Sequence, residues 1–365
     1  MRKIDFKIPF SGFAATTFIN CFTSAYMYLE STDFQSAKTT FCNMWVNGQC
    51  NSCGNCATKP QTLQERYFFL FDTICGRSAL RNRFDDTPTP MDTMINYHGI
   101  GYDGGAADNI DFLFGFTGYR YHTVTDAAKF KKEITDSICA DKPVITRLKD
   151  NEVDFAIIVG LDGDQIICPD FKAAQKTPNP AVSYDNIDTL YIIGEKEAPK
   201  YSLLDGLKRI ANVMDYCLGT DIWGEYMKKI GTYGPDSLGE DKPDGRKARM
   251  NRLASTMWYT FNCHNFAEVF RTYLGDKQTA YLYDTVNDVK KLGDPALGEL
   301  LQAISWRYGY THDLAWSIIG LDECINWNDW KSHYYGDMLE VIIDKLKEND
   351  RAVFECIQKI IEYLS

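Results

Sequence analysis

Cys21, Asp154 and Asp170 are the residues of this sequence whose types could together perform thiol chemistry. Apolar residues at helical spacing follow Cys21 between positions 22 and 28, which predicts a helix that begins at the cysteine. The free N–H groups and the positive dipole of a helix start lower the pKa of a cysteine thiol. A nucleophilic cysteine also needs a base that takes its proton and a third group that orients the base. Asp154 and Asp170 are the candidates for these two roles.

A predicted β-hairpin brings the two carboxylates to the same end of one structural unit. Two apolar stretches between Asp154 and Asp170 are separated by Asp162-Gly163. This dipeptide is a strong signal for a two-residue turn, because such turns need a positive φ that glycine adopts easily. With these two residues in the turn, Asp154 lies across from Phe171, one residue from Asp170. The hairpin therefore predicts that the carboxylates are adjacent.

Three short motifs follow one another in the first half of the chain. Cys21 stands in Asn-Cys-Phe-Thr-Ser-Ala-Tyr-Met-Tyr-Leu, Lys142 opens Lys-Pro-Val-Ile, and Asp154 opens Asp-Phe-Ala-Ile-Ile-Val-Gly-Leu-Asp, with Asp170 further on. In type and order they resemble the papain-like family that includes the bacteriocin-leader peptidases. The similarity is greater to the N-terminal domain of the butirosin-pathway acyltransferase and its relatives. It covers residues 1–196, roughly half of the chain.

This resemblance implies an α+β papain-like domain with an antiparallel sheet and an N-terminal helix. It implies Cys21 as the nucleophile, Asp154 at the position of the base and Asp170 as the orienting acid. The substrate implied is a peptide or the thioester of an acyl-carrier protein, because members of the family act on such groups.

Two departures from the family pattern bear on activity. Asp154 occupies the position where the family has histidine, and no glutamine precedes Cys21, so Asn20 is the nearby candidate for an oxyanion donor. A solvated aspartate with a pKa of ~3.9 is a poor base for a thiol of pKa ~8.5, and its charge disfavours the thiolate. A second carboxylate nearby would raise one of the two pKa values. The sequence thus leaves open a thiol enzyme and a non-catalytic binding or scaffold protein that uses the cleft between two domains.

The chain has five histidines that could replace the missing base from elsewhere. His98 lies in a glycine-rich loop, and His264 lies in a predicted helix that could face the first domain. His122 is the third candidate. A lone histidine is more often a hydrogen-bonded core or surface residue than a catalytic one.

A cluster of four cysteines predicts a metal site. Its members lie within fifteen residues in a segment rich in glycine, asparagine and serine: Cys42, Cys50, Cys53 and Cys56. Four thiolates can complete the tetrahedral shell of a structural zinc ion. The spacing is also similar to one iron–sulfur pattern, but the fourth cysteine and the following proline are missing at the usual distance. Disulfides or free thiols in the same loop are the alternative to zinc.

Composition and charge exclude several other classes. A hydrophobic fraction of 45% and a charged fraction of 24% are those of a globular protein. The net charge of -11 argues against a nucleic-acid partner, because phosphate binding needs clustered lysine and arginine. No apolar run approaches the length of a membrane span, and no convincing signal peptide is present, so we expect a cytoplasmic protein with mostly reduced cysteines. The sequence assigns no oligomeric state.

The length of 365 residues favours two domains. Strand and loop patterns dominate residues 1–196, whereas residues 200–365 have helical patterns almost throughout. We therefore predict a papain-like domain over 1–196 and an all-helical domain over 200–365, joined at a polar connection that contains Pro199. The clearest expected elements are strands at 144–148 and 189–193 and helices at 129–138, 248–274, 295–308 and 338–364.

Overall fold

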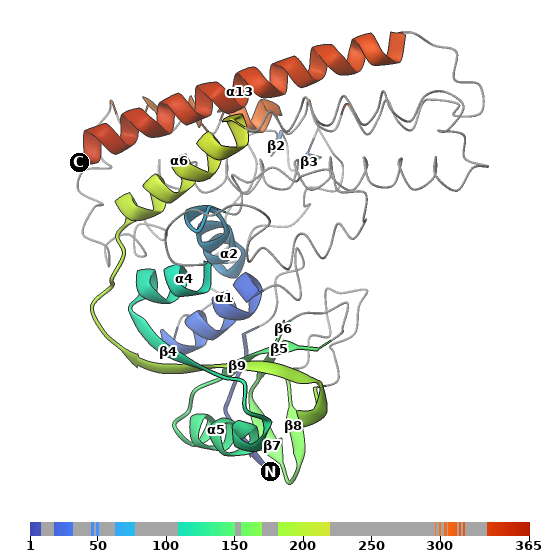
Figure 1. Ribbon diagram of the computed structural model, residues 1–365, viewed down its shortest axis with the longest axis vertical. Coiled ribbons are helices and arrows are strands. Elements are labelled where there is room, and N and C mark those ends of the chain that lie inside the picture. The colour runs from blue at the N-terminus through green and yellow to red at the C-terminus, as the bar shows by residue number, and fades with distance from the viewer. Residues whose placement is uncertain are drawn as a thin grey trace, which may run out of the picture.

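The protein combines helices with antiparallel β-sheets (Figure 1). This computed structural model describes residues 1–8, 18–31, 63–76, 109–149, 155–169, 182–219 and 334–365, the paired strands at 45–46 and 49–50, and residues 296, 299–300, 303–304, 306–311, 314 and 317. The mixture of helices and antiparallel strands confirms the predicted α+β class for this part of the chain. The finer assignment to a papain-like fold and the division near residue 196 stay predictions.

The larger sheet has four antiparallel strands in the order β4 (Tyr119–Val124), β9 (Ile187–Lys196), β5 (Val144–Leu148) and β6 (Phe155–Ile158). Nearly every residue of β5 and β6 is buried, which requires cover on both faces of the sheet. Helices α1 (Phe18–Leu29) and α5 (Ala127–Cys139) supply it, packing against the sheet from opposite sides (Figure 1). The strands predicted at 144–148 and 189–193 are both confirmed.

Helix α5 shows how local sequence sets one of these layers. The carboxylate of Asp126 caps the helix by accepting a hydrogen bond from the N–H of Ala128 at 3.1 Å. Phe130, Ile134 and Ile138 recur on one face and are buried, whereas the lysines between them are exposed. The helix predicted at 129–138 is therefore confirmed.

A second, smaller sheet consists of β1 (Arg2–Lys3), β7 (Gly160–Asp162) and β8 (Gln165–Ile167). Strands β6 and β7 are successive parts of one extended segment, because only Val159 separates them. The first part pairs with β5 in the large sheet, and the second part pairs with β1 and β8. One segment thus belongs to both sheets.

The hairpin between β7 and β8 exists, but its predicted register is wrong by one residue. Asp162 pairs with Gln165, so the turn consists of Gly163 and Asp164 rather than Asp162 and Gly163. Gly163 has a φ of 61°, and a type II′ turn places glycine at this first central position. On the N-terminal side of Val159 the segment leaves the hairpin and pairs with β5. Among the described residues, the hairpin pairing therefore stops near Val159. The predicted pairing that would place Asp154 across from Phe171 is not continued there.

Helices form the rest of the described structure. In Figure 1, α2 (Leu63–Ile74) and α4 (Asn109–Thr117) lie between α1 and the outer pair α6 (Leu203–Gly219) and α13 (Tyr334–Leu364). The helix predicted at 338–364 is confirmed, and the described residues between 296 and 308 are helical as expected. The hydroxyl of Tyr308 donates to Asp350 of α13 at 3.0 Å. The helix predicted at 248–274 lies outside the described residues.

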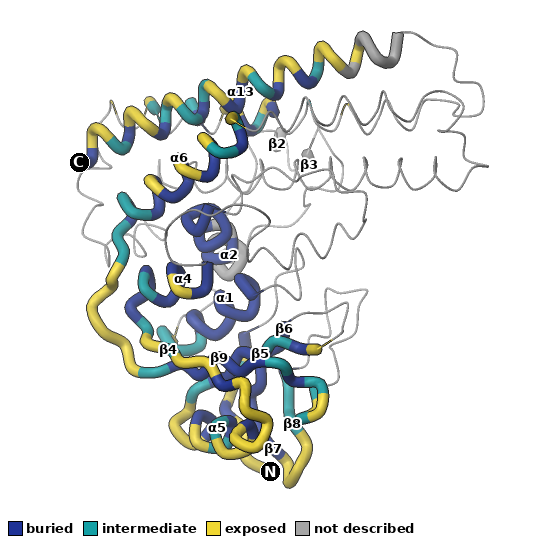
Figure 2. The backbone as a smooth tube through the Cα atoms, in the orientation of Figure 1, coloured by how far each residue is buried: buried dark blue, intermediate teal, exposed yellow. Residues whose placement is uncertain are grey.

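Burial follows this arrangement (Figure 2). Helix α1 is buried almost all round, whereas α5 and α13 expose one face each. Aromatic rings fill the space around α1, as the aromatic content of 14% suggests. Phe22, for example, contacts Phe71 and Phe114 edge-on at centroid distances of 5.3 and 5.0 Å. The site around Cys21 is therefore built inside an aromatic core.

Candidate functional site

Cys21 lies in the first turn of α1. The helix begins at Phe18, three residues before the predicted start, so Cys21 is the fourth helical residue and does not precede the helix. Its exposed fraction is 0%. Asn20, the candidate oxyanion donor, is also in the helix and is equally buried. Cys21 is thus in the first turn of a helix, close to the predicted start, whereas the inclusion of Asn20 in the helix and the burial of both residues were not predicted.

Burial dominates the electrostatics of Cys21. Removal from solvent raises the pKa of its thiol well above the ordinary value, and the nearby Cys168 raises it further. A hydrogen bond from its own backbone N–H lowers the pKa, which is the effect expected at a helix start, but this contribution is smaller. At neutral pH the side chain is therefore a protonated thiol and a poor nucleophile.

Cys168 is the neighbour that the sequence interpretation did not assign to the site. It directly follows β8, whose last residue Ile167 accepts a hydrogen bond from the N–H of Val159 at 2.8 Å. Val159 in turn follows β6, which packs against α1. Burial raises the pKa of Cys168 to about 12. The hairpin therefore brings a second protonated thiol toward Cys21, and the only signal for this in the sequence was the hairpin itself.

The two carboxylates of the predicted triad cannot be placed beside Cys21. Asp154 and Asp170 lie outside the described residues, each immediately next to a described segment. Their predicted roles as base and orienting acid stay predictions.

Among the five histidines, His122 is the one that the structure describes. It lies on β4 with its side chain 59% exposed, and its Nε2 is 3.6 Å from Glu133 Oε2 of α5. This position makes it a surface partner of α5. His98 and His264 lie outside the described residues, as do His312 and His333.

One member of the cysteine cluster has a described backbone. Cys50 lies on β3 (Gln49–Cys50), opposite Trp45 of β2 (Trp45–Val46), so a short antiparallel strand pair precedes the dense part of the cluster. The other three cysteines lie outside the described residues, and no group of metal-binding side chains occurs among those the structure does describe. A zinc site at Cys42, Cys50, Cys53 and Cys56 stays a prediction.

We expect protein purified without added metal to contain about one zinc ion per chain, because four thiolates satisfy a structural zinc. Elemental analysis by mass spectrometry measures this. Replacing both Cys50 and Cys53 by serine should remove the zinc, whereas replacing the exposed Cys139 should not. Metal-free protein in which all four cluster thiols titrate freely would contradict the expectation.

A cavity of about 330 Å³ is the second candidate site. It lies where α4, β4 and the connection after β9 meet, next to the predicted boundary between the two domains. Its lining contains two acidic and two basic side chains beside aromatic rings and glycines: Asp111, Phe114, Gly115, Gly118, Tyr119, Arg120, Tyr121, Glu197, Ala198 and Lys200. No sequence motif identified this cavity, because its lining comes from segments about eighty residues apart.

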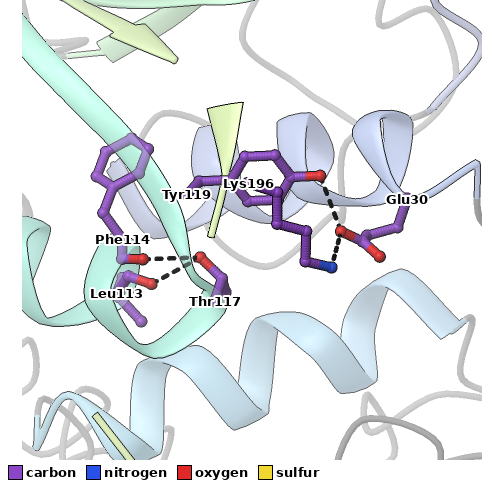
Figure 3. A network of polar contacts seen from close by, with 6 residues as sticks. All are labelled: Glu30, Leu113, Phe114, Thr117, Tyr119 and Lys196. Carbon is purple, nitrogen blue, oxygen red and sulfur yellow. Dashed lines mark hydrogen bonds and ion pairs between the residues drawn. The ribbon is translucent and has the colours of Figure 1, made fainter. Parts of the chain in front are cut away.

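Polar contacts hold one wall of the cavity in place (Figure 3). Glu30, at the end of α1, accepts hydrogen bonds from the hydroxyl of Tyr119 at 2.8 Å and from the ammonium group of Lys196. Thr117 donates to the carbonyl oxygens of Leu113 and Phe114 at 2.9 and 3.3 Å. Burial and the bond to Glu30 raise the pKa of Tyr119, so its phenol stays protonated. The ring of Tyr119 is thereby fixed at the cavity.

The described chain is thus an α+β protein with a buried thiol at Cys21, a partly buried thiol at Cys168 and a separate cavity of mixed charge. No protein-family model, curated protein or solved structure matches it. None of the described helices is long and apolar enough to cross a membrane.

Proposed function

We propose that this protein is a papain-like protein whose thiol site has lost its catalytic role and that it acts by binding. The observation that carries the proposal is the complete burial of Cys21, with a pKa raised well above the ordinary value. A thiol nucleophile must reach its substrate and ionise near neutral pH. A buried, protonated thiol beside a second thiol meets neither requirement.

The substitution at the base position supports the same conclusion. The papain-like resemblance places histidine where this chain has Asp154. An imidazolium ion would stabilise a thiolate at Cys21, whereas a carboxylate would oppose it. A protein that acts by binding needs neither the imidazolium nor the thiolate. Such a protein can keep the fold without the catalytic residues, because the fold still forms a binding surface or cavity.

A thiol peptidase or acyltransferase is the second candidate function. The place of Cys21 in the first turn of α1 favours it, since this is where a helix start stabilises a thiolate. Its substrate would be a peptide or an acyl-carrier thioester, as the family resemblance implies. This function requires a conformation in which Cys21 becomes accessible.

The reactivity of Cys21 separates the two functions. At pH 7 we expect Cys21 to react with iodoacetamide about a hundredfold more slowly than the exposed Cys139 of the same chain, because burial raises its pKa and blocks access. Peptide mass spectrometry of time points between pH 6 and pH 10 measures both rates, with a Cys21→Ala variant to verify the assignment. Reaction at Cys21 faster than at Cys139 at pH 7 would overturn the proposal and favour the enzyme.

A further inference from the structure

We infer that the cavity between α4, β4 and the connection after β9 binds a small zwitterion in the size range of a free amino acid. This inference rests on the proposed function to the extent that the protein acts by binding. The cavity measures about 330 Å³ and presents two carboxylates and two cationic groups. An aromatic amino acid fits both this charge balance and the half-buried tyrosine rings in the lining.

Backbone hydrogen bonds fix two segments of the lining relative to each other before any ligand arrives. The backbone N–H of Lys200 donates to the carbonyl of Gly115 at 2.7 Å, and that of Glu197 donates to Gly118 at 2.7 Å. These bonds attach the connection after β9 to the end of α4. A Cβ atom on Gly115 would lie 2.6 Å from the ring of Tyr201, and one on Gly118, whose φ is +79°, would lie 2.4 Å from the carbonyl oxygen of Glu197. Glycine at both positions therefore permits a close, fixed approach.

The carboxylate of Asp111 is oriented by its neighbours and can receive an ammonium group. The hydroxyl of Tyr121 donates a hydrogen bond to Asp111, and the ring of Tyr121 stacks on Phe114 at a centroid distance of 4.2 Å. Asp111 is exposed, so its carboxylate can accept further hydrogen bonds. An incoming ammonium group would thus meet an oriented carboxylate.

The guanidinium group of Arg120 can exchange its partner at low cost. Arg120 pairs with Glu197, but the two side chains are 70% and 49% exposed. Such exposed pairs contribute little to stability, so a ligand carboxylate can replace Glu197 on the guanidinium group. Lys200 lies nearby, and its pKa is raised by Tyr201 and by the charge of Asp111. It therefore carries a full positive charge.

The pairing of opposite charges selects the class of ligand. A simple anion drawn to Arg120 and Lys200 would also face the carboxylates of Asp111 and Glu197, and a simple cation would face the two basic groups. A zwitterion presents a carboxylate to one pair and an ammonium group to the other. Each of its charges can then pair with a group of opposite sign in the lining, which a neutral ligand cannot do.

Binding of L-phenylalanine tests the inference, with two matched derivatives that each lack one charge. Saturation-transfer NMR and chemical-shift titration should show saturable binding of L-phenylalanine with a Kd below about 1 mM. N-acetyl-L-phenylalanine, which lacks the ammonium group, and L-phenylalanine amide, which lacks the carboxylate, should each bind about tenfold more weakly. The variants Arg120→Gln and Asp111→Asn should each weaken the binding of L-phenylalanine by a similar factor. Lys132→Gln serves as a control, since Lys132 is exposed on α5 and does not line the cavity.

Two results would overturn the inference: no saturable binding up to about 10 mM, or equal binding of the three compounds. If Arg120→Gln and Asp111→Asn leave the binding of L-phenylalanine unchanged, the ligand binds elsewhere. That result would also overturn the inference. Circular dichroism verifies that each variant is folded. The rate of iodoacetamide reaction at Cys21 is measured independently. A reactive Cys21 would contradict the proposed function, whereas a cavity that binds no ligand would contradict only this inference.

Discussion

Arg209→Met is expected to destabilise the protein by about 3 to 5 kcal/mol. Arg209 lies on α6 and is only 9% exposed. Its Nε donates to the carbonyl oxygen of Cys75 at 2.6 Å, and its Nη2 donates to Asn109 Oδ1 at 2.8 Å. Methionine would leave both acceptors buried without these donors, and each such loss costs about 1 to 3 kcal/mol.

Arg209 connects two helices that are far apart in the sequence. Cys75 directly follows α2 and Asn109 begins α4, so one guanidinium group joins the end of one helix to the start of another. A cation at a helix C-terminus is also favoured by the helix dipole. The guanidinium carbon lies 5.2 Å from the centre of the Phe112 ring, which adds a cation–π contact.

Urea denaturation of Arg209→Met measures the predicted loss. Lys208→Met is the matched control, because Lys208 is the preceding residue of the same helix and is exposed. We expect the control to change the free energy of unfolding by less than about 0.5 kcal/mol. If both variants unfold at the same urea concentration as the unmodified protein, the buried network does not support the packing of α6.

Phe18→Ala is expected to cost about 3 to 5 kcal/mol. Phe18 is 5% exposed, and its ring lies within 5.6 to 6.3 Å of four other rings, measured between centroids. These rings come from α1, α4, β6 and β9: Phe22, Phe114, Phe155 and Tyr191. Alanine would leave a cavity where α1 meets both α4 and the sheet.

Thermal and urea denaturation of Phe18→Ala test this expectation. Phe18→Leu retains most of the apolar volume and should lose roughly half as much stability. Tyr363→Ala is the surface control, because Tyr363 is 46% exposed near the end of α13. A loss no larger in Phe18→Ala than in Tyr363→Ala would show that the aromatic cluster is not the centre of the core.

The elements that the sequence predicted well are those that a single local pattern determines. Strand β5 has the predicted bounds, because the β-branched residues Val144, Ile145 and Thr146 follow directly on the turn-forming segment that ends at Pro143. Helix α5 followed from apolar residues at spacings of four. Such patterns depend only on neighbouring residues, so they can be interpreted without knowledge of the rest of the fold.

The hairpin at Gly163 shows where local patterns become insufficient. Both possible registers place Gly163 in the turn, and they differ in whether the glycine is the first or the second central residue. The actual register pairs Gly160 with Ile167 and brings the backbone of Lys3 and Arg2 against Gly160, where a Cβ atom would lie 2.5 Å from the Arg2 carbonyl oxygen. Packing against β1 is a long-range contact, and the sequence near the turn does not contain it.

The candidate site was predictable only in part for the same reason. The place of Cys21 at the start of a helix followed from the apolar spacing after it. Its burial and its nearness to Cys168 depend on how α1 packs against β6, which lies over a hundred residues later. The mixed-charge cavity likewise needs α4 and the connection after β9 to meet. These contacts have no local sequence signal.

The extended segment shared by the two sheets limits where the chain can change length. An additional residue near Val159 would shift one half of the segment relative to the other and turn its buried side chains to the opposite face. At the turn, by contrast, a Cβ atom on Gly163 would meet nothing within 4 Å. We therefore expect insertions, labels and fused peptides to be tolerated at the turn and not at the junction, although only three residues lie between the two positions.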